Sequence, residues 1–385
     1  MKIGILTMNY TCNYGGILQC VALRNVLEGM GYEVEVIRFS SKNRGRMRRK
    51  LMMLLSGISF RTLFYYVSDI LSNIWERLTG RQKMLSDRLL SKNRLFIDKY
   101  IRYTELCNDD TIGKLVNEHA LDAIVIGSDK VWGELPREQL VYMGDWTPPF
   151  RGKLISYAAC SSFPVIPKHN FDKIHNLLNS FSAISVRDNY TRDLFKCYTD
   201  INMNVVLDPA FLYDYAAFLK RREEKPYILT YILGREIEGG HKRIIELIKE
   251  IYGDIKVKAI ILSNESTDIV EYADEVIDDA DPQEWMNCIY NASFVYTDSF
   301  HGIVFSLKFQ KQFVAYYREA SRASRLLDLK DRFSLDSVIV SSVNQVREKS
   351  SITTKLDYQM VSREIEKQKG YSLSFLQNTL SVDAN

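Results

Sequence analysis

Residues that usually build metal or disulfide sites are scarce in this chain of 385 residues, which has six cysteines and five histidines. The cysteines form no CxxC pair, and none has a histidine at the spacing of metal ligands, so the sequence does not indicate a zinc site. Scattered cysteines in a chain of this size favour reduced thiols in the cytosol. They are Cys12, Cys20, Cys107, Cys160, Cys197 and Cys288.

Long hydrophobic runs are also missing. No stretch reaches the roughly 18 consecutive apolar residues that a membrane-spanning helix needs. The N-terminus leads directly into the short apolar segment at residues 3–6 and lacks the long apolar core of a signal peptide. We therefore expect a cytoplasmic protein, whose contact with a membrane would be peripheral.

Neither sign of charge dominates, because 51 lysines and arginines face 48 acidic residues, for a net charge of +3. This balance lacks the strong positive field of a nucleic-acid-binding protein, so no nucleic-acid partner is expected. The sequence contains neither GxGxxG nor GxxxxGK[ST], so bound NAD and a P-loop ATP site are not indicated.

The chain instead alternates apolar strand patterns with helical ones. From the N-terminus the pattern predicts a strand, a turn, a helix and a second strand, at residues 2–7, 13–16, 17–30 and 33–39. This order builds parallel, doubly wound sheets. Gly31 marks the expected end of the helix.

The alternation continues in two groups of strands. Further strands of the first group are predicted at residues 121–127, 153–157, 183–186 and 204–207, and those of the second group at residues 227–233, 256–262, 294–297 and 312–316. A polar run at residues 220–225, followed by Pro226, separates the groups.

We therefore predict an α/β protein with two doubly wound, Rossmann-like domains at residues 1–220 and 221–350, followed by a C-terminal helical tail at residues 351–385. Two such domains bind ligands between them, at the carboxyl ends of their strands, in a GT-B-like arrangement.

Residues 42–100 interrupt the first domain and are predicted to form a helical insertion. Six basic residues lie between positions 42 and 50, and aromatic and aliphatic residues follow. One interpretation is peripheral contact of residues 42–75 with anionic lipid on the inner membrane face, since each basic side chain there contributes about 1 kcal/mol. The other is a helical hairpin packed on the domain.

The strongest local signal lies at residues 296–302, where an apolar strand is followed by Asp298, Ser299 and the start of a helix. A helix N-terminus presents backbone N–H groups and about half a positive charge to an anion. His301 falls in the first helical turn, where it can donate a proton or bind a phosphate. The alternative is a structural histidine beside a helix cap.

Arg187 follows the predicted strand at residues 183–186 and therefore faces the same expected cleft. Its planar guanidinium can bind a carboxylate or phosphate with two hydrogen bonds. The alternative is a surface ion pair with Asp188 or Asp193, which would contribute little.

Small residues follow two other strands, as Gly15-Gly16 and Gly127-Ser128, and they would let a ligand approach the backbone. Asp129 comes next in the second of these segments. It is either a general base for a sugar hydroxyl or the cap of the following turn.

Six segments in this order resemble the polysaccharide pyruvyl transferase family. The resemblance spans the chain from Met1 to about Arg318, apart from the insertion. The segments are residues 13–16, 126–132, 156–159, 185–188, 207–209 and 297–302.

This resemblance implies a GT-B-like transferase that moves the enolpyruvyl unit of phosphoenolpyruvate onto a hexose of the galactose or mannose type, as a ketal. The acceptor would belong to a polysaccharide or a lipid-linked repeat unit of a capsule or exopolysaccharide. The first domain would bind the acceptor and the second the donor. Phosphoenolpyruvate would be a co-substrate, with no separate cofactor and no metal.

By motif match, His301 is the expected general acid or phosphate contact and Arg187 the anion-binding residue. Asp129 is the candidate base from its position after the strand. The expected substrate-binding residues are Asn13, Tyr14, Gly15, Gly16, Gly127, Ser128, Ser299, Phe300, Gly302 and Arg318. Ser299 departs from the family pattern, which has an arginine there. Candidates to replace that arginine are Arg318, Arg322 and Arg325.

Three other functions fit the same pattern. A nucleotide-sugar glycosyltransferase would bind a diphosphate in the same cleft. A non-catalytic sugar- or phosphate-binding protein of polysaccharide assembly would retain the cleft without turnover, and an assembly scaffold would work through the insertion.

Overall fold

The computed structural model describes residues 1–8, 13–41, 87–133, 140–161, 171–221, 225–234, 236–262, 270–318 and 323–381. The predicted lipid contact at residues 42–75 lies outside these ranges. The described end of the predicted insertion is helix α4 (Asp87–Tyr100).

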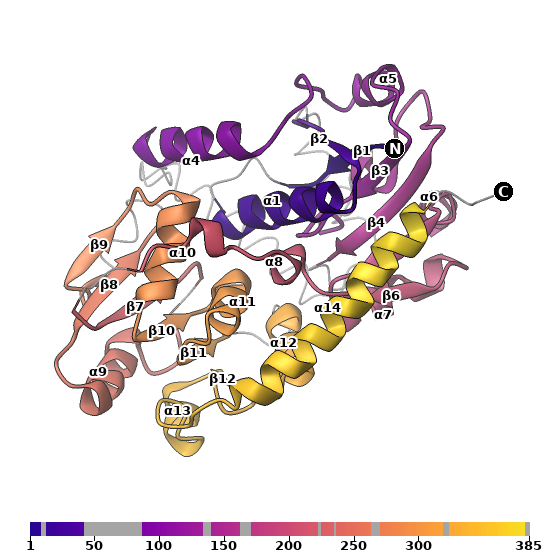
Figure 1. Ribbon diagram of the computed structural model, residues 1–385. Helices are drawn as coiled ribbons and strands as arrows, with labels where there is room; N and C mark the ends of the chain where they lie inside the picture. Colours follow the sequence, from indigo (N-terminus) through magenta and orange to yellow (C-terminus); the bar gives the residue numbers. More distant parts are fainter. Residues whose placement is uncertain are drawn as a thin grey trace, which may run out of the picture.

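The first domain is built on a six-stranded parallel sheet in the order β2-β1-β3-β4-β5-β6, as the described residues show (Figure 1). Its strands are β1 (Lys2–Leu6), β2 (Glu33–Val36), β3 (Ala123–Ile126), β4 (Lys153–Ala159), β5 (Ala183–Val186) and β6 (Met203–Val205). Its helices include α1 (Tyr14–Gly29), α5 (Ile112–Glu118), α6 (Phe171–Leu178), α7 (Asn189–Phe195) and the short α8 (Pro209–Leu212).

The second domain repeats this plan with a six-stranded parallel sheet in the order β12-β11-β10-β7-β8-β9, again among the described residues. Its strands are β7 (Tyr227–Tyr231), β8 (Lys256–Ile260), β9 (Glu275–Ile277), β10 (Phe294–Thr297), β11 (Phe313–Tyr316) and β12 (Ile339–Val340). Its helices include α9 (His241–Tyr252), α10 (Pro282–Asn291), α11 (Phe300–Lys308), α12 (Ser324–Arg332) and α13 (Val343–Glu348).

Central strands of both sheets are buried along their whole length, as in β3, β7 and β10. Helices cover both faces of a parallel sheet, which is why these strands are continuous apolar runs rather than alternating ones. The predicted α/β class with two doubly wound domains is confirmed. The chain passes from the first sheet to the second between β6 and β7.

The predicted turn at residues 13–16 is wrong, because α1 begins at Tyr14. Asn13 caps the helix, and its side-chain oxygen accepts hydrogen bonds from the backbone of Gly15 at 3.1 Å and of Gly16 at 3.4 Å. The cap satisfies helix donors and offsets the low helix propensity of two glycines. The helix ends at Gly29, and Gly31 adopts a positive φ of 89° as expected after a helix.

The C-terminal tail forms one long helix, α14 (Tyr358–Leu380), that runs back from the second domain to the first (Figure 1). Near its end, Lys153 of β4 donates a hydrogen bond to the carbonyl of Ser381 at 3.0 Å. Ser372, in the middle of the helix, accepts a hydrogen bond from the backbone of Leu207 at 3.0 Å. At its start, Tyr358 donates a hydrogen bond to the carbonyl of Lys311 in the second domain, so the helix contacts both domains.

Aromatic side chains pack where α1 of the first domain meets the second. The Tyr14 ring stacks on Trp285 of α10 with ring centroids 5.6 Å apart, and it lies 5.8 Å from the ring of Tyr231 in β7. All three residues belong to one hydrophobic core that includes side chains of both domains. This contact fixes the position of the first turn of α1 against the second domain.

Candidate active site at the domain interface

A buried carboxylate, that of Asp208, lies where the two domains meet. Its Oδ2 atom accepts hydrogen bonds from Ser128 Oγ at 2.9 Å and from Arg187 Nη1 at 2.8 Å. From the second domain, His301 places its Nε2 atom 3.5 Å from the same oxygen. We call these four residues, Ser128, Arg187, Asp208 and His301, the Asp208 cluster.

Asp208 stays ionised in this environment. Burial alone would raise its pKa, but the neighbouring His301 and Arg187 hold the pKa of the carboxyl well below its usual range. The other carboxylate oxygen accepts a hydrogen bond from the backbone of Ala210 at 2.9 Å, so Asp208 also caps α8. A helix N-terminus favours a negative charge at this position.

Arg187 follows β5 and is almost fully buried, with 1% of its surface exposed. Besides Asp208, its guanidinium contacts the Cys160 sulfur at 2.8 Å and lies 3.7 Å from Oδ1 of Asp129. Burial raises the pKa of the Cys160 thiol to about 11, so the thiol is neutral and Asp208 is the main counter-ion.

The alternative of a surface ion pair at Arg187 is wrong. Asp188 instead caps α7 by accepting a hydrogen bond from the backbone of Thr191 at 2.7 Å. Asp193 is exposed and pairs with Arg192 and Lys196. The buried partner, Asp208, lies 21 residues further along the chain from Arg187.

His301 lies in the first turn of α11 and is only 4% exposed. Its ring packs against Gly15 so closely that a Cβ atom at that glycine would lie 2.1 Å from His301 Cγ. The first turns of α1 and α11, one from each domain, therefore meet at this histidine. His301 Nε2 has no hydrogen-bond partner among the described residues, although Asp208 is nearby.

The predicted start of α11 at Phe300 is confirmed. Ser299 is the N-cap, and its hydroxyl accepts a hydrogen bond from the backbone of Gly302 at 3.3 Å. A Cβ atom at Gly302 would lie 2.6 Å from Thr297 Oγ1, so glycine permits the close approach of the helix to the end of β10.

Phe300 places its ring over Arg187, whose guanidinium carbon lies 4.3 Å from the ring centroid. The guanidinium of Arg325, in the first turn of α12, lies 6.0 Å from the same centroid. The charge of Arg325 lowers the pKa of Lys130 to about 8. Two guanidinium groups thus lie near the Phe300 ring, next to the Asp208 cluster.

Gly127, Ser128 and Asp129 follow β3, as the sequence predicted. A Cβ atom at Gly127 would lie 2.8 Å from Thr7 Cβ, so the glycine serves close packing within the first domain. Asp129 has a φ of 76°, in the left-handed region, and it is 8% exposed beside Arg187. A positive φ in a non-glycine residue is uncommon and is often found at functional sites.

Arg318 does not join this group. It is exposed at the carboxyl edge of the second sheet, where its Nη1 atom donates a hydrogen bond to the Glu236 carbonyl at 3.0 Å. Arg322 lies outside the described residues. Of the three arginines considered as replacements at Ser299, Arg325 is the one that the structure places beside Phe300.

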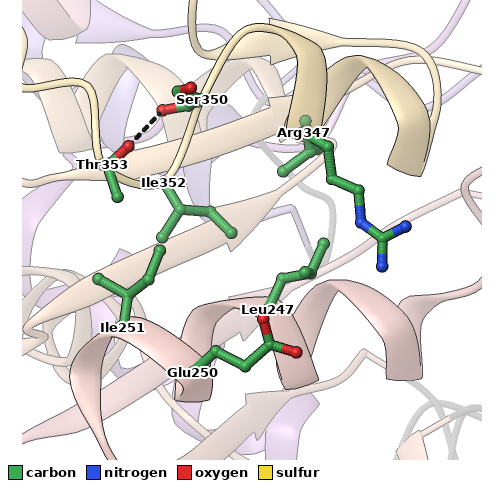
Figure 2. Close-up of a pocket in the computed structure, with 8 residues that line it drawn as sticks. Leu247, Glu250, Ile251, Arg347, Ser350, Ile352 and Thr353 are labelled. Carbon is green, nitrogen blue, oxygen red and sulfur yellow. Dashed lines mark hydrogen bonds between the residues drawn. The ribbon is translucent and has the colours of Figure 1, made fainter.

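A cavity of about 220 Å³ lies elsewhere, between α9 and α13 of the second domain (Figure 2). Its lining combines aliphatic side chains, such as Leu247, Ile251 and Ile352, with polar ones that include Glu250 and Arg347. In Figure 1, α9 and α13 lie at the edge of the second domain, away from α1 and α8. The cavity is therefore separate from the Asp208 cluster.

Asp208, Cys160 and Lys130 were not predicted from the sequence to act in the site. Asp208 lies in the segment at residues 207–209, where the Asp-Pro pair indicated only a break between elements. The available signal was its place directly after a predicted strand, at the same sheet edge as Arg187. Nothing local marks Cys160 or Lys130.

Within the described ranges, no group of three or more His, Cys, Asp or Glu side chains is arranged to hold a metal ion. Within the same ranges, no helix has the length and apolar character needed to cross a membrane.

Solved structures with the same two-domain fold include enzymes that act on nucleotide sugars. The UDP-GlcNAc 2-epimerase of Methanocaldococcus jannaschii has a TM-score of 0.52 at 10% identity, with 93% of each chain covered. The UDP complex of MnaA from S. aureus has a TM-score of 0.52 at 13% identity, covering 98% of this chain and 95% of that one. UGT89C1 of Arabidopsis thaliana, solved with UDP-L-rhamnose, has a TM-score of 0.50 at 8% identity, with 97% of each chain covered.

These similarities define the fold as GT-B-like, with the Asp208 cluster between its two domains. At such low identity they carry no information about substrate. No curated protein matches the chain. The polysaccharide pyruvyl transferase family model matches residues 13–319, and the chain belongs to that family. The match covers every member of the Asp208 cluster.

The contact between Gly15 and His301 predicts a steric effect. We expect Gly15→Ala to lower the free energy of unfolding by about 1–3 kcal/mol, because the added methyl group would overlap the imidazole. Gly29→Ala, at the other end of α1, is the matched control: its Cβ would meet no atom within 4 Å, so stability should stay equal or rise. Urea unfolding measures both. An equal change in the free energy of unfolding for the two variants would contradict the close contact between Gly15 and His301.

The ionised state of Asp208 predicts a pH-dependent stability. The pKa of Asp208 is lower in the folded protein than in the unfolded chain, where it is about 4. The Asp208 carboxylate therefore stabilises the fold above about pH 4, and this contribution is lost progressively as the pH falls from there toward the pKa of the folded state. We expect Asp208→Asn to cost about 3–5 kcal/mol at pH 7, because Arg187 is left buried without its counter-ion. Urea unfolding near pH 3 should show a smaller difference. A difference independent of pH would be inconsistent with an ionised Asp208.

Proposed function

We propose that the protein transfers the enolpyruvyl unit of phosphoenolpyruvate to a hexose of the galactose or mannose type, forming a pyruvate ketal on a polysaccharide or a lipid-linked repeat unit. Membership of the family supports this reaction. The observation that carries the proposal is the Asp208 cluster, which brings an imidazole and a guanidinium together at the domain interface.

The reaction needs an acid and a site for anions. Protonation of the methylene carbon of phosphoenolpyruvate makes the adjacent carbon electrophilic, and one sugar hydroxyl attacks it. Inorganic phosphate then leaves, and a second hydroxyl closes the ketal ring. One hydroxyl proton balances the proton gained by the methyl group, and the other leaves with the phosphate.

His301 is the residue that we assign to proton transfer or to phosphate binding. Its Nε2 atom is buried 3.5 Å from Asp208 and forms no hydrogen bond with the described residues, and we assign this atom to the contact with substrate. Asp208 and Gly15 fix the ring, which places it before substrate binds. Asp129, beside Arg187, is the candidate base for the sugar hydroxyl.

A nucleotide-sugar glycosyltransferase is less well supported by the second domain. Backbone N–H groups at the carboxyl edge of its sheet already bind carboxylates: Asp298 accepts hydrogen bonds from Leu233 at 2.7 Å and Gly234 at 2.6 Å. Glu236 accepts one from the backbone of His241, the first residue of α9, at 2.9 Å. A diphosphate would compete with both carboxylates for these donors, and like charges would repel it.

Three further parts of the proposal follow from the family and the sequence. Phosphoenolpyruvate serves as co-substrate without a separate cofactor. The acceptor is associated with capsule or exopolysaccharide synthesis on the cytoplasmic side, and residues 42–75 contact the membrane there.

Flotation with anionic liposomes tests the membrane contact. The proposed contact is wrong if deletion of residues 44–75 leaves liposome binding unchanged.

The reaction predicts release of inorganic phosphate from phosphoenolpyruvate that depends on an acceptor. We expect release with a galactoside or mannoside from a panel, and a loss of about 100-fold or more in His301→Ala, because general acid catalysis contributes 10²–10⁴-fold. Arg187→Ala should also abolish release, since Asp208 would lose its counter-ion. Arg347→Ala, at the edge of the α9–α13 cavity, is the control and should be unaffected.

The kinetic constants of the His301 variant distinguish its two roles. A general acid should affect mainly kcat, whereas a ground-state phosphate contact should affect mainly KM. Turnover of a nucleotide sugar without phosphate release would contradict the proposed reaction. Tight phosphoenolpyruvate binding with no turnover on any acceptor would favour a non-catalytic binding protein.

A further inference from the structure

Two guanidinium groups lie near the ring of Phe300, and their environments differ. Arg187 is buried, and both of its Nη atoms have protein partners, Asp208 and Cys160. Arg325 is half-buried and forms no ion pair or hydrogen bond with any residue that the structure describes; its buried Nε atom has no partner. The Nε atom of Arg187 is also buried without a partner, so the two arginines differ at their Nη atoms: those of Arg325 have no partner among the described residues and are the ones available to a ligand.

A purely structural role explains Arg325 poorly. Helix α12 is anchored by the buried side chains of Leu326 and Leu329. Asp328 of the same helix is bound by the first domain, because Asn189 donates to it from its backbone at 3.0 Å and from its side chain at 2.8 Å. The guanidinium of Arg325 lies 6.0 Å from the centroid of the Phe300 ring, at the limit of a cation–π contact, so this contact contributes little to stability.

The charge around Arg325 is unbalanced. Lys130, from the loop after β3, is close enough for the Arg325 charge to lower its pKa to about 8, with burial contributing further. Asp129 is the nearby carboxylate that favours the charged lysine, and it already lies 3.7 Å from Arg187. Lys130 and Arg325 come from different domains and share with Arg187 the single nearby carboxylate of Asp129, so a bound anion would stabilise this group of cations.

We propose that Arg325, together with Lys130, binds an anionic group of the donor directly, and that Arg187 acts indirectly, by positioning Asp208 and Phe300. This inference rests on the proposed function for the identity of the donor. The chemistry that the two residues recognise is a phosphate or carboxylate group, which Arg325 can bind with two parallel hydrogen bonds while Lys130 supplies a point charge. Because α12 belongs to the second domain and Lys130 to the first, such a ligand would bridge the domains.

The test is isothermal titration of the full chain with phosphoenolpyruvate and, separately, with inorganic phosphate. We expect Arg325→Gln to weaken phosphoenolpyruvate binding by about 10- to 100-fold, as for the loss of a charge-assisted hydrogen bond. Arg325→Lys should recover only part of the affinity, since lysine cannot bind with two parallel hydrogen bonds. Arg347→Gln, a control arginine at the α9–α13 cavity, should bind as the wild type does.

Two further measurements exclude an indirect effect. Thermal unfolding of Arg325→Gln should match that of the wild type, because α12 keeps its buried leucines. The pKa of Lys130, followed by the pH dependence of its amine labelling and mass spectrometry, should rise in Arg325→Gln, because the neighbouring charge is gone. A structural role for Arg325 would change unfolding and would leave donor affinity unchanged in the folded protein.

The outcomes separate this inference from the proposed function. If phosphoenolpyruvate is turned over and Arg325→Gln binds it as tightly as the wild type, the inference is wrong and the function stands. If phosphoenolpyruvate does not bind but inorganic phosphate binds and depends on Arg325, the anion site stands and the donor is wrong. If the wild type binds neither phosphoenolpyruvate nor inorganic phosphate, the inference is wrong.

Discussion

The burial of the negative charge of Asp208 is the constraint on which the site depends. An unpaired carboxylate in this position would cost several kcal/mol, so the fold must bring a positive partner to it. Arg187, from the end of β5, supplies that charge, and Ser128 supplies a hydrogen bond. His301 approaches the same carboxylate from the second domain. A site that combines these groups exists only when the two domains are docked.

The surrounding packing holds the domains in that position. The ring of Tyr14 stacks on Trp285 across the interface, and Gly15 packs directly against His301. Helix α14 contacts the second domain through Tyr358 and the first through Ser372. A transferase gains from such rigidity, because donor and acceptor must meet in one geometry and prior positioning removes part of the entropic cost of the reaction. The arrangement agrees with the family, whose reaction joins two substrates.

Much of the fold could be predicted from the sequence because parallel strands are buried on both faces and give continuous apolar runs. The motif at His301 could also be predicted from the sequence, since a strand, a capping serine and a helix follow one another directly. The partner of Arg187 could not be predicted in this way. Asp208 is 21 residues away in the sequence, and the two side chains meet only because the folded sheet brings the ends of their strands to the same edge. The start of α1 was placed too late, because Gly15 and Gly16 are poor helix formers and their tolerance depends on the Asn13 cap and on the proximity of His301.

The most direct test of this account is a double-mutant cycle between Asp208 and His301, measured as free energies of unfolding at neutral pH for the wild type, Asp208→Asn, His301→Ala and the double variant. If the carboxylate links the two domains through this histidine, the effects should be non-additive, with a coupling free energy of about 1–3 kcal/mol. Additivity within about 0.5 kcal/mol would show that the two residues act independently, and it would contradict a site organised around Asp208.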